Sequence, residues 1–391
     1  MADGQAIAAT GSRLGHIGDI PQTEAKAAGG RFEVLDSLRG VCAVLVVLYH
    51  VVLNNHLAPL SFIRGGYMFV DFFFVLSGFV IAYNYAGRIR DKSSFGDFLI
   101  KRFFRLWPLH LFLLMLYFVV EIGGLAGTEM GSRTGRTVPD LIRTGTLTNA
   151  IGMDHQSNWN MPSWSISGEW WTYIVFGLIV LVLPRLFRPA LLGLVAVGLA
   201  VIVTNHDSIH IMADHGIFRC FVGFGLGAFL ATIWPAVAPR LEALGNRWLG
   251  AAEIALVIGI PLFVAASRLT AWSFLAPFVF VIAVAVFALE RGPVSRLLHH
   301  RLFLRAGLLS FSIYMVHNFV MGRVANAAGF VQRHTGLQLD YSNAVQMDVL
   351  TLVTIVAVWF AAEATYRLVE KPGQALGGRV LARWKRRARA A

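Results

Sequence analysis

The chain alternates between long apolar segments and short polar ones, and this pattern predicts a protein built from membrane-spanning helices. An apolar run of roughly 17 to 25 residues can cross a bilayer as an α-helix. About ten segments approach that length, and the fifth is the shortest. Their approximate bounds are 38–57, 67–86, 106–123, 164–183, 189–204, 214–233, 249–266, 271–289, 305–323 and 345–368. We therefore expect an all-α, polytopic integral membrane protein with about ten transmembrane helices.

Composition supports this fold class and gives the expected orientation. Of the 391 residues, 56% are hydrophobic and only 14% are charged, whereas soluble proteins carry about 25% charged residues. With the N-terminus placed in the cytoplasm, most Lys and Arg residues fall in cytoplasmic loops or at the C-terminus, so both termini are expected inside. The net charge of +12 then reflects orientation and attraction to membrane lipids, and no nucleic-acid partner is predicted.

The membrane domain is predicted to cover residues 31–372. Residues 1–30 are mostly Ala, Gly and polar residues, which predicts a disordered cytoplasmic tail. Residues 373–391 predict a basic cytoplasmic tail that lies on the membrane surface. The two cysteines, Cys42 and Cys220, both fall in predicted spans, so their positions indicate neither a disulfide framework nor a metal site.

The first span contains two ionisable residues, Arg39 and His50, in the segment LDSLRGVCAVLVVLYHVVL. On a helix they lie on nearly the same face, roughly 16 Å apart along the axis. Ionisable residues inside a membrane are costly and usually functional. This spacing favours a long ligand with an anionic head near Arg39 and a reactive end near His50. An interfacial arginine and a hydrogen-bonded packing histidine are the alternative.

A basic cluster, Lys101, Arg102 and Arg105, follows the second span on the predicted cytoplasmic side. Positions three apart share a helix face, so Arg102 and Arg105 could bind one phosphate together. Basic residues here also follow from the positive-inside rule alone. Because Arg39 reaches the same surface, we favour a polyanionic ligand.

Other polar residues lie inside the second, fourth and sixth spans. Asp71 and Ser77 are in the second span, where an aspartate requires a partner. Glu169 is in the second turn of the fourth span, where it could orient an imidazole, accept a proton or cap the helix. Arg219, in the sixth span, is expected to pair with Asp71 or Glu169, and such a pair could be purely structural.

The predicted outer side holds candidates for contacts with a second substrate. His317, in the ninth span, is a second candidate base or hydrogen-bonding residue, and Tyr314 lies in the same segment, SFSIYMVH. Residue types suited to sugar contacts lie in and just after the long outer loop, although an interfacial aromatic belt explains them equally well. They are Asp154, His155, Trp159 and Trp164.

Another predicted outer segment, NHDSIHIMADHG, is rich in histidine and aspartate. His206 and His210 are four residues apart, a spacing that can bind a metal. The sequence contains no H-E-x-x-H motif, and a solvated loop is the better interpretation. No metal site is therefore predicted.

In order along the chain, these motifs resemble those of acyltransferase family three, a family of integral membrane proteins. The Arg39–His50 pair resembles its first-helix signature, FVDFFFVLSGF its second-helix signature, and KRFFRLWP its basic loop. SWSISGEWW, FRCFVGFGLG, SFSIYMVH and YRLVEKP also fit, so the resemblance runs from about residue 32 to 372. One departure is Gly168, where family members commonly carry a small hydrophobic residue.

The resemblance implies an enzyme of a bacterial-type inner membrane that transfers an acyl group, usually acetyl, from acyl-coenzyme A to a carbohydrate hydroxyl. Acetyl-coenzyme A would be the donor substrate, and no metal is implied. The donor-binding candidates are Arg39, Lys101, Arg102, Arg105 and Ser77. The catalytic candidates are His50, as general base or transient acyl carrier, with Glu169 and Asp71. The acceptor-binding or structural candidates are Arg219, His317, Trp164 and Tyr314.

Two other functions share this membrane architecture. A transporter or flippase of a glycan or small molecule would also contain intramembrane charges, but it would not bind an acyl donor. A sensor or scaffold would bind the donor without turnover. The absence of two-half symmetry in the sequence weakens the transporter alternative.

Overall fold

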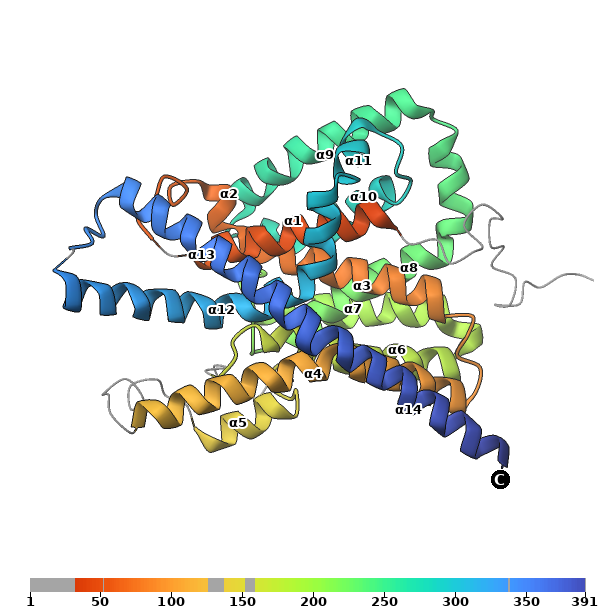
Figure 1. Cartoon of the computed structure of the whole chain (residues 1–391). Helices are drawn as coiled ribbons and strands as arrows, with labels where there is room; N and C mark the ends of the chain where they lie inside the picture. Colours follow the sequence, from red (N-terminus) through yellow and green to blue (C-terminus); the bar gives the residue numbers. More distant parts are fainter. Residues whose placement is uncertain (1–31, 52, 126–136, 152–158, 337, 391) are drawn as a thin grey trace, which may run out of the picture.

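A computed structural model describes residues 32–51, 53–125, 137–151, 159–336 and 338–390, and these residues form helices joined by short connections (Figure 1). No strand occurs in these ranges. The all-α, polytopic fold class is thus confirmed. The predicted tail over residues 1–30, and Asp154 and His155 of the long loop, lie outside the described residues.

The helices follow one another with few residues between them. Their bounds are α1 Glu33–His50, α2 Ser61–Arg64, η1 Gly66–Met68, α3 Phe69–Tyr85, α4 Lys92–Leu125, α5 Val138–Gly145, α6 Ser163–Val182, η2 Pro184–Leu186, α7 Phe187–Asn205, α8 Gly216–Glu242, α9 Asn246–Ser267, η3 Ala271–Leu275, α10 Ala276–Phe287, α11 Pro293–Leu298, α12 Arg301–Thr335, α13 Ala344–Thr365, η4 Tyr366–Glu370 and α14 Lys371–Ala390. The short segment η4 is a π-helix, whereas η1, η2 and η3 are 3-10 helices.

Within the described residues, 8 helical segments are long and apolar enough to cross a membrane. They correspond to eight of the predicted spans. The first and eighth predicted spans are not among these 8 segments, and each has its own physical reason. Helix α1 carries the charged residues Glu33, Asp36 and Arg39 among its 18 residues, and the apolar segment Ala271–Phe287 is shorter than each of the 8 long segments.

Close helix contacts hold the centre of the bundle together. Helix α3 packs against α8, where a Cβ atom on Gly78 would lie 2.0 Å from the Phe224 carbonyl oxygen. Gly78 therefore permits the close approach of α8. Helix α1 packs against α12 in the same way, since a Cβ on Gly307 would lie 2.4 Å from the Asp36 carbonyl oxygen. Small residues at such contacts are the usual means of packing membrane helices.

The last helix, α14, continues from α13 through η4 and packs along α4 (Figure 1). At Gly373 and Gly377 the two helices touch, because a Cβ there would lie 2.7 Å and 2.5 Å from side-chain atoms of Pro108 and Phe104. The predicted basic tail is therefore helical and begins as part of the bundle. Its position on a membrane surface stays a prediction.

Candidate active site

A cavity of about 130 Å³ lies among α1, α3, α4, α6 and α12, and we call it the basic cavity. Its charged lining consists of three arginines and one carboxylate. The polar residues that line it are Arg39, Ser77, Arg102, Arg105, Ser165, Glu169, Tyr173, Ser310 and Tyr314. Residues from five separate segments of the sequence thus form one site. Of the predicted donor-binding residues, Lys101 is exposed, and its ammonium lies over the Tyr85 ring at 5.7 Å from the centroid.

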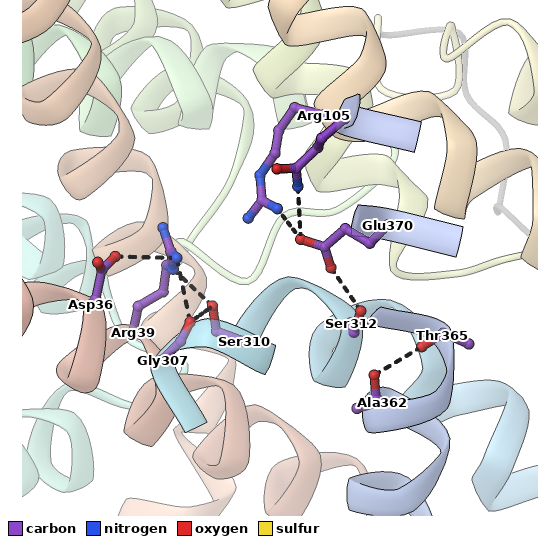
Figure 2. A network of polar contacts seen from close by, with 10 residues as sticks. Asp36, Arg39, Arg105, Gly307, Ser310, Ser312, Ala362, Thr365 and Glu370 are labelled. Atoms are coloured by element: carbon purple, nitrogen blue, oxygen red, sulfur yellow. Dashed lines mark hydrogen bonds and ion pairs between the residues drawn. The ribbon is translucent and has the colours of Figure 1, made fainter. Parts of the chain in front are cut away.

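Arg39 is held in place by α1 and α12 (Figure 2). Its Nε donates to the Ser310 hydroxyl at 2.7 Å, and its Nη2 donates to the Gly307 carbonyl at 3.4 Å. An ion pair with Asp36, one turn earlier, measures 3.2 Å. The close packing at Gly307 brings α12 within reach of the guanidinium, which remains at the wall of the basic cavity.

Arg105 forms an ion pair with Glu370, a residue that the sequence reasoning did not single out (Figure 2). Glu370 is only 2% exposed and also accepts a hydrogen bond from the Ser312 hydroxyl at 2.7 Å. It lies at the end of the π-helix η4, a wider turn that is often found at functional sites. Its only sequence signal is its place in YRLVEKP.

Arg102 differs from the other two arginines of the basic cavity. Its guanidinium lies over the rings of Tyr85 and Tyr173, at 5.4 Å and 6.0 Å from the centroids. A long hydrogen bond of 3.5 Å reaches the Tyr85 hydroxyl. No carboxylate among the described residues pairs with it, and its buried Nε has no hydrogen-bond partner there. Arg102 is therefore the least neutralised cation of the cavity.

Among the described residues, Glu169, on α6, is the one carboxylate that lines the basic cavity. The Ser77 hydroxyl donates to it at 2.5 Å, and the Tyr173 hydroxyl donates to the same oxygen. Within the described part of the chain, no hydrogen bond joins Glu169 to His50. Glu169 accepts hydrogen bonds from the hydroxyls of Ser77 and Tyr173, and these two hydroxyls also lie 2.9 Å from each other. The described contacts therefore do not include the predicted one, in which Glu169 would orient His50.

His50 lies in a second, smaller cavity of about 20 Å³, which we call the histidine chamber. The chamber is lined by Tyr49, His50, Tyr67, Val70, Met161, Pro162, Trp164, His210, Met212, Arg219 and Tyr314. His50 Nδ1 lies 2.8 Å from the Val46 carbonyl oxygen. A carbonyl can only accept, so Nδ1 carries the proton and Nε2 keeps the lone pair that a general base requires.

His317 is fully buried beside His50, and the two ring centroids are 4.8 Å apart. Its Nδ1 lies 2.6 Å from the Tyr314 carbonyl oxygen, so this nitrogen also carries the proton. Its Nε2 is buried without a hydrogen-bond partner in the described structure. Two imidazoles thus present the same tautomer close to each other, from α1 and α12.

Arg219 and Asp71 form a buried ion pair, which confirms the expectation that Arg219 pairs with a carboxylate and identifies the partner. The two hydrogen bonds measure 2.9 Å and 2.7 Å, and the side chains are 1% and 0% exposed. The carbonyl oxygens of Ile211 and Tyr67 accept two further bonds at 2.8 Å each. The Trp164 ring lies under the guanidinium at 5.3 Å. This pairing satisfies Arg219 at one wall of the histidine chamber.

Among the described residues, Tyr314 and Val70 line both cavities, and we call these two residues the partition. The Ser165 hydroxyl donates to the Tyr314 hydroxyl at 2.8 Å. His210 was not predicted as a chamber residue. It comes from the loop before α8, and its Nε2 lies 2.9 Å from the Tyr49 hydroxyl. Burial lowers the pKa of His210, which favours its neutral form.

A family model described as an acyltransferase domain matches residues 32–363, a range that contains every described residue lining the two cavities. Glu370 lies beyond this range. The chain belongs to acyltransferase family three. The family assignment drawn from the sequence motifs is thereby confirmed.

Relatives of the chain within this family carry related names. A protein named as a membrane-bound transacylase, BcsY of Komagataeibacter xylinus, is 25% identical over 87% of this chain and 82% of its own length. The O-acetyltransferase OatA of Staphylococcus aureus is 22% identical over 86% of this chain and 56% of its own length. The acyltransferase MdmB of Streptomyces mycarofaciens is 32% identical over 38% of this chain and 39% of its own. No solved structure matches the chain significantly.

Proposed function

We propose that this acyltransferase moves an acetyl group from acetyl-coenzyme A to a hydroxyl of a carbohydrate across the plane of a bacterial inner membrane. The observation that carries the proposal is the pair of adjoining cavities, one lined by arginines and the other by histidines, which share Tyr314 and Val70 as lining residues among those described. The donor would enter from the end of the bundle where α4 begins, which the positive-inside rule predicts to be cytoplasmic. The acceptor would reach the opposite end.

The arginines of the basic cavity would bind the phosphates of the donor. Arg102 is the first candidate because no carboxylate neutralises it among the described residues. Arg39 and Arg105 have carboxylate partners, Asp36 and Glu370, and would add hydrogen bonds to a phosphate from the other side of the cavity. Planar guanidinium groups suit such bidentate contacts with phosphate oxygens.

In the chemical step, the acceptor hydroxyl would transfer its proton to His50 Nε2 while its oxygen attacks the thioester carbonyl carbon. The new carbon–oxygen bond forms, and the carbon–sulfur bond then breaks. The departing thiolate takes up the proton from the imidazolium. The tautomer set by the Val46 carbonyl supports this role, since it leaves Nε2 unprotonated before the reaction. The buried Nε2 of His317 would accept a second hydrogen bond from the acceptor.

The thioester must pass the partition to meet His50. A rotation of the Tyr314 side chain would join the two cavities, because this ring and Val70 alone line both among the described residues. The hydroxyls of Tyr314 and Ser165, now hydrogen-bonded to each other, would then be positioned to donate to the oxyanion of the tetrahedral intermediate. Glu169 would keep the Ser77 side chain in place through the hydrogen bond that it accepts from the Ser77 hydroxyl.

The proposal is tested by separating donor binding from turnover in purified protein. Acetyl-coenzyme A binding is measured by calorimetry, and release of the free thiol is followed in the presence of candidate oligosaccharides. His50→Ala is expected to bind the donor as the wild type does and to release thiol about 10²–10⁴-fold more slowly. His334→Ala, an exposed histidine far along α12, is the matched control. Undiminished turnover in His50→Ala would overturn the mechanism, and absence of donor binding would favour a transporter.

A further inference from the structure

The loop between α7 and α8 brings two histidines and an aspartate together at the end of the bundle opposite the basic loop. His206 Nε2 and His215 Nδ1 are 3.0 Å apart, and Asp214 Oδ1 lies 3.3 Å from the same His215 nitrogen. All three potential ligand atoms lie within 4.8 Å of one another. The sequence reasoning considered His206 with His210, but the fold pairs His206 with His215 instead.

We propose that His206, Asp214 and His215 form a binding site for a divalent transition metal of the zinc type. Two imidazole nitrogens and one carboxylate oxygen are a common zinc ligand set, with a fourth position left for water or substrate. With metal–ligand distances of about 2.0–2.1 Å, tetrahedral geometry separates ligand atoms by roughly 3.3 Å. The observed separations of 3.0 Å and 3.3 Å are close to that value.

The surroundings of the cluster favour a cation. Asp207 follows His206 and Asp214 precedes His215 in the sequence, so two carboxylates flank the imidazole pair. His215 has a φ of 53°, a left-handed conformation that is uncommon for a residue other than glycine. The left-handed backbone conformation, in which the His215 ring lies beside His206, costs conformational free energy, and such strained residues are frequent in functional sites.

The cluster closes the loop that supplies His210 to the histidine chamber. His206 follows directly after α7, and His215 directly precedes α8, so a shared metal would join the two ends of the loop. Between them, Ile209 and Ile211 are buried, and the Ile211 carbonyl accepts a bond from Arg219. A bound metal would therefore fix the position of His210 beside Tyr49. The metal site itself does not rest on the proposed reaction.

The site is tested on the full-length protein in detergent, after removal of any affinity tag and treatment with a chelator. Zn²⁺ is titrated by calorimetry, and Co²⁺ is added separately to record the visible absorption of a tetrahedral site. The wild type is expected to bind about one equivalent. His206→Ala and His215→Asn should each weaken binding by more than about tenfold, since even loss of an outer-shell partner costs that much. Asparagine is chosen because it tolerates the left-handed conformation.

Two controls make the result decisive. Asp207→Asn removes a neighbouring charge but no ligand, and His334→Ala removes an exposed histidine elsewhere. Both should retain stoichiometric binding and the Co²⁺ spectrum. Zn²⁺ should also raise the melting temperature of the wild type and not that of His206→Ala. The site is overturned if the wild type binds no metal, or if the ligand variants and the controls bind it equally well.

Discussion

The histidine chamber and the basic cavity contain arginines that differ in how fully the protein satisfies their hydrogen-bond donors. Arg219, at the histidine chamber, makes four hydrogen bonds, two to Asp71 and two to backbone carbonyls, and is 1% exposed. Arg102, at the basic cavity, has aromatic rings around it and one long hydrogen bond, with no carboxylate partner in the described structure. One guanidinium has its bonding capacity met by the protein, whereas the other retains capacity for a ligand.

This contrast shows how intramembrane charges can be sorted by function. Charged residues in membrane helices are generally taken as functional, yet a fully paired guanidinium has little to offer a substrate. The number of donors that remain unsatisfied separates a structural charge from a ligand-binding one. By this criterion Asp71, a catalytic candidate from the sequence, is the ion-pair partner of Arg219 where α3 packs against α8.

The largest expected effect is on stability, from breaking the buried pair. Asp71→Ala leaves Arg219 buried and uncompensated, which should cost about 3–5 kcal/mol and sharply reduce the yield of folded protein. Asp71→Leu combined with Arg219→Met removes both charges and should recover most of that loss. Thermal denaturation in detergent measures both. Equal instability of the single and double variants would show that the pair does more than balance charge.

The next effect concerns ligand affinity at the unneutralised arginine. Arg102→Ala should weaken acetyl-coenzyme A binding by roughly 10- to 150-fold, the value of a hydrogen bond to a charged group. The melting temperature should hardly change, because Arg102 forms no ion pair among the described residues. Calorimetry with donor, beside a thermal scan without it, distinguishes this outcome from unfolding. A large loss of stability with unchanged affinity would reverse the contrast between Arg102 and Arg219.

Much of this arrangement follows from the sequence, because helix length and hydropathy are local properties. The predicted spans 67–86 and 164–183 agree with α3, Phe69–Tyr85, and α6, Ser163–Val182, within two residues at each end. The clustering of Arg39, Arg102 and Arg105 also follows, since the predicted topology places the start of the first span and the loop after the second span at one membrane surface.

The remaining features depend on side-chain directions that no linear pattern contains. Asp71 and Glu169 have similar predicted depth, and only the packing of α3 on α8 selects Asp71 as the partner of Arg219. Glu370 contacts Arg105 from the end of η4, and the hydropathy pattern does not predict a π-helix there. The partition depends on how the Tyr314 side chain is held by Ser165.

A smaller effect, on thermal stability, is expected at Arg105, whose ion-pair partner is Glu370. Glu370→Gln keeps the shape of the side chain but leaves Arg105 without its counter-charge, so the apoprotein should be less stable. Donor phosphate would then supply the missing negative charge. Acetyl-coenzyme A should therefore raise the melting temperature of this variant by more than it raises that of the wild type. An equal or smaller increase would indicate that Arg105 does not face the donor.

The smallest effect is expected at Lys101, which the sequence grouped with Arg102 and Arg105. Its side chain is exposed and lies over Tyr85, outside the basic cavity. Exposed charges contribute about 0–1 kcal/mol and are screened by salt. Lys101→Ala should change donor affinity by less than about fivefold, and this difference should vanish at high ionic strength. The Arg102→Ala effect should persist under the same conditions, because salt screens partly buried charges much less. If salt abolished both effects equally, the donor phosphates would lie at the surface of the bundle and the basic cavity would not be their binding site.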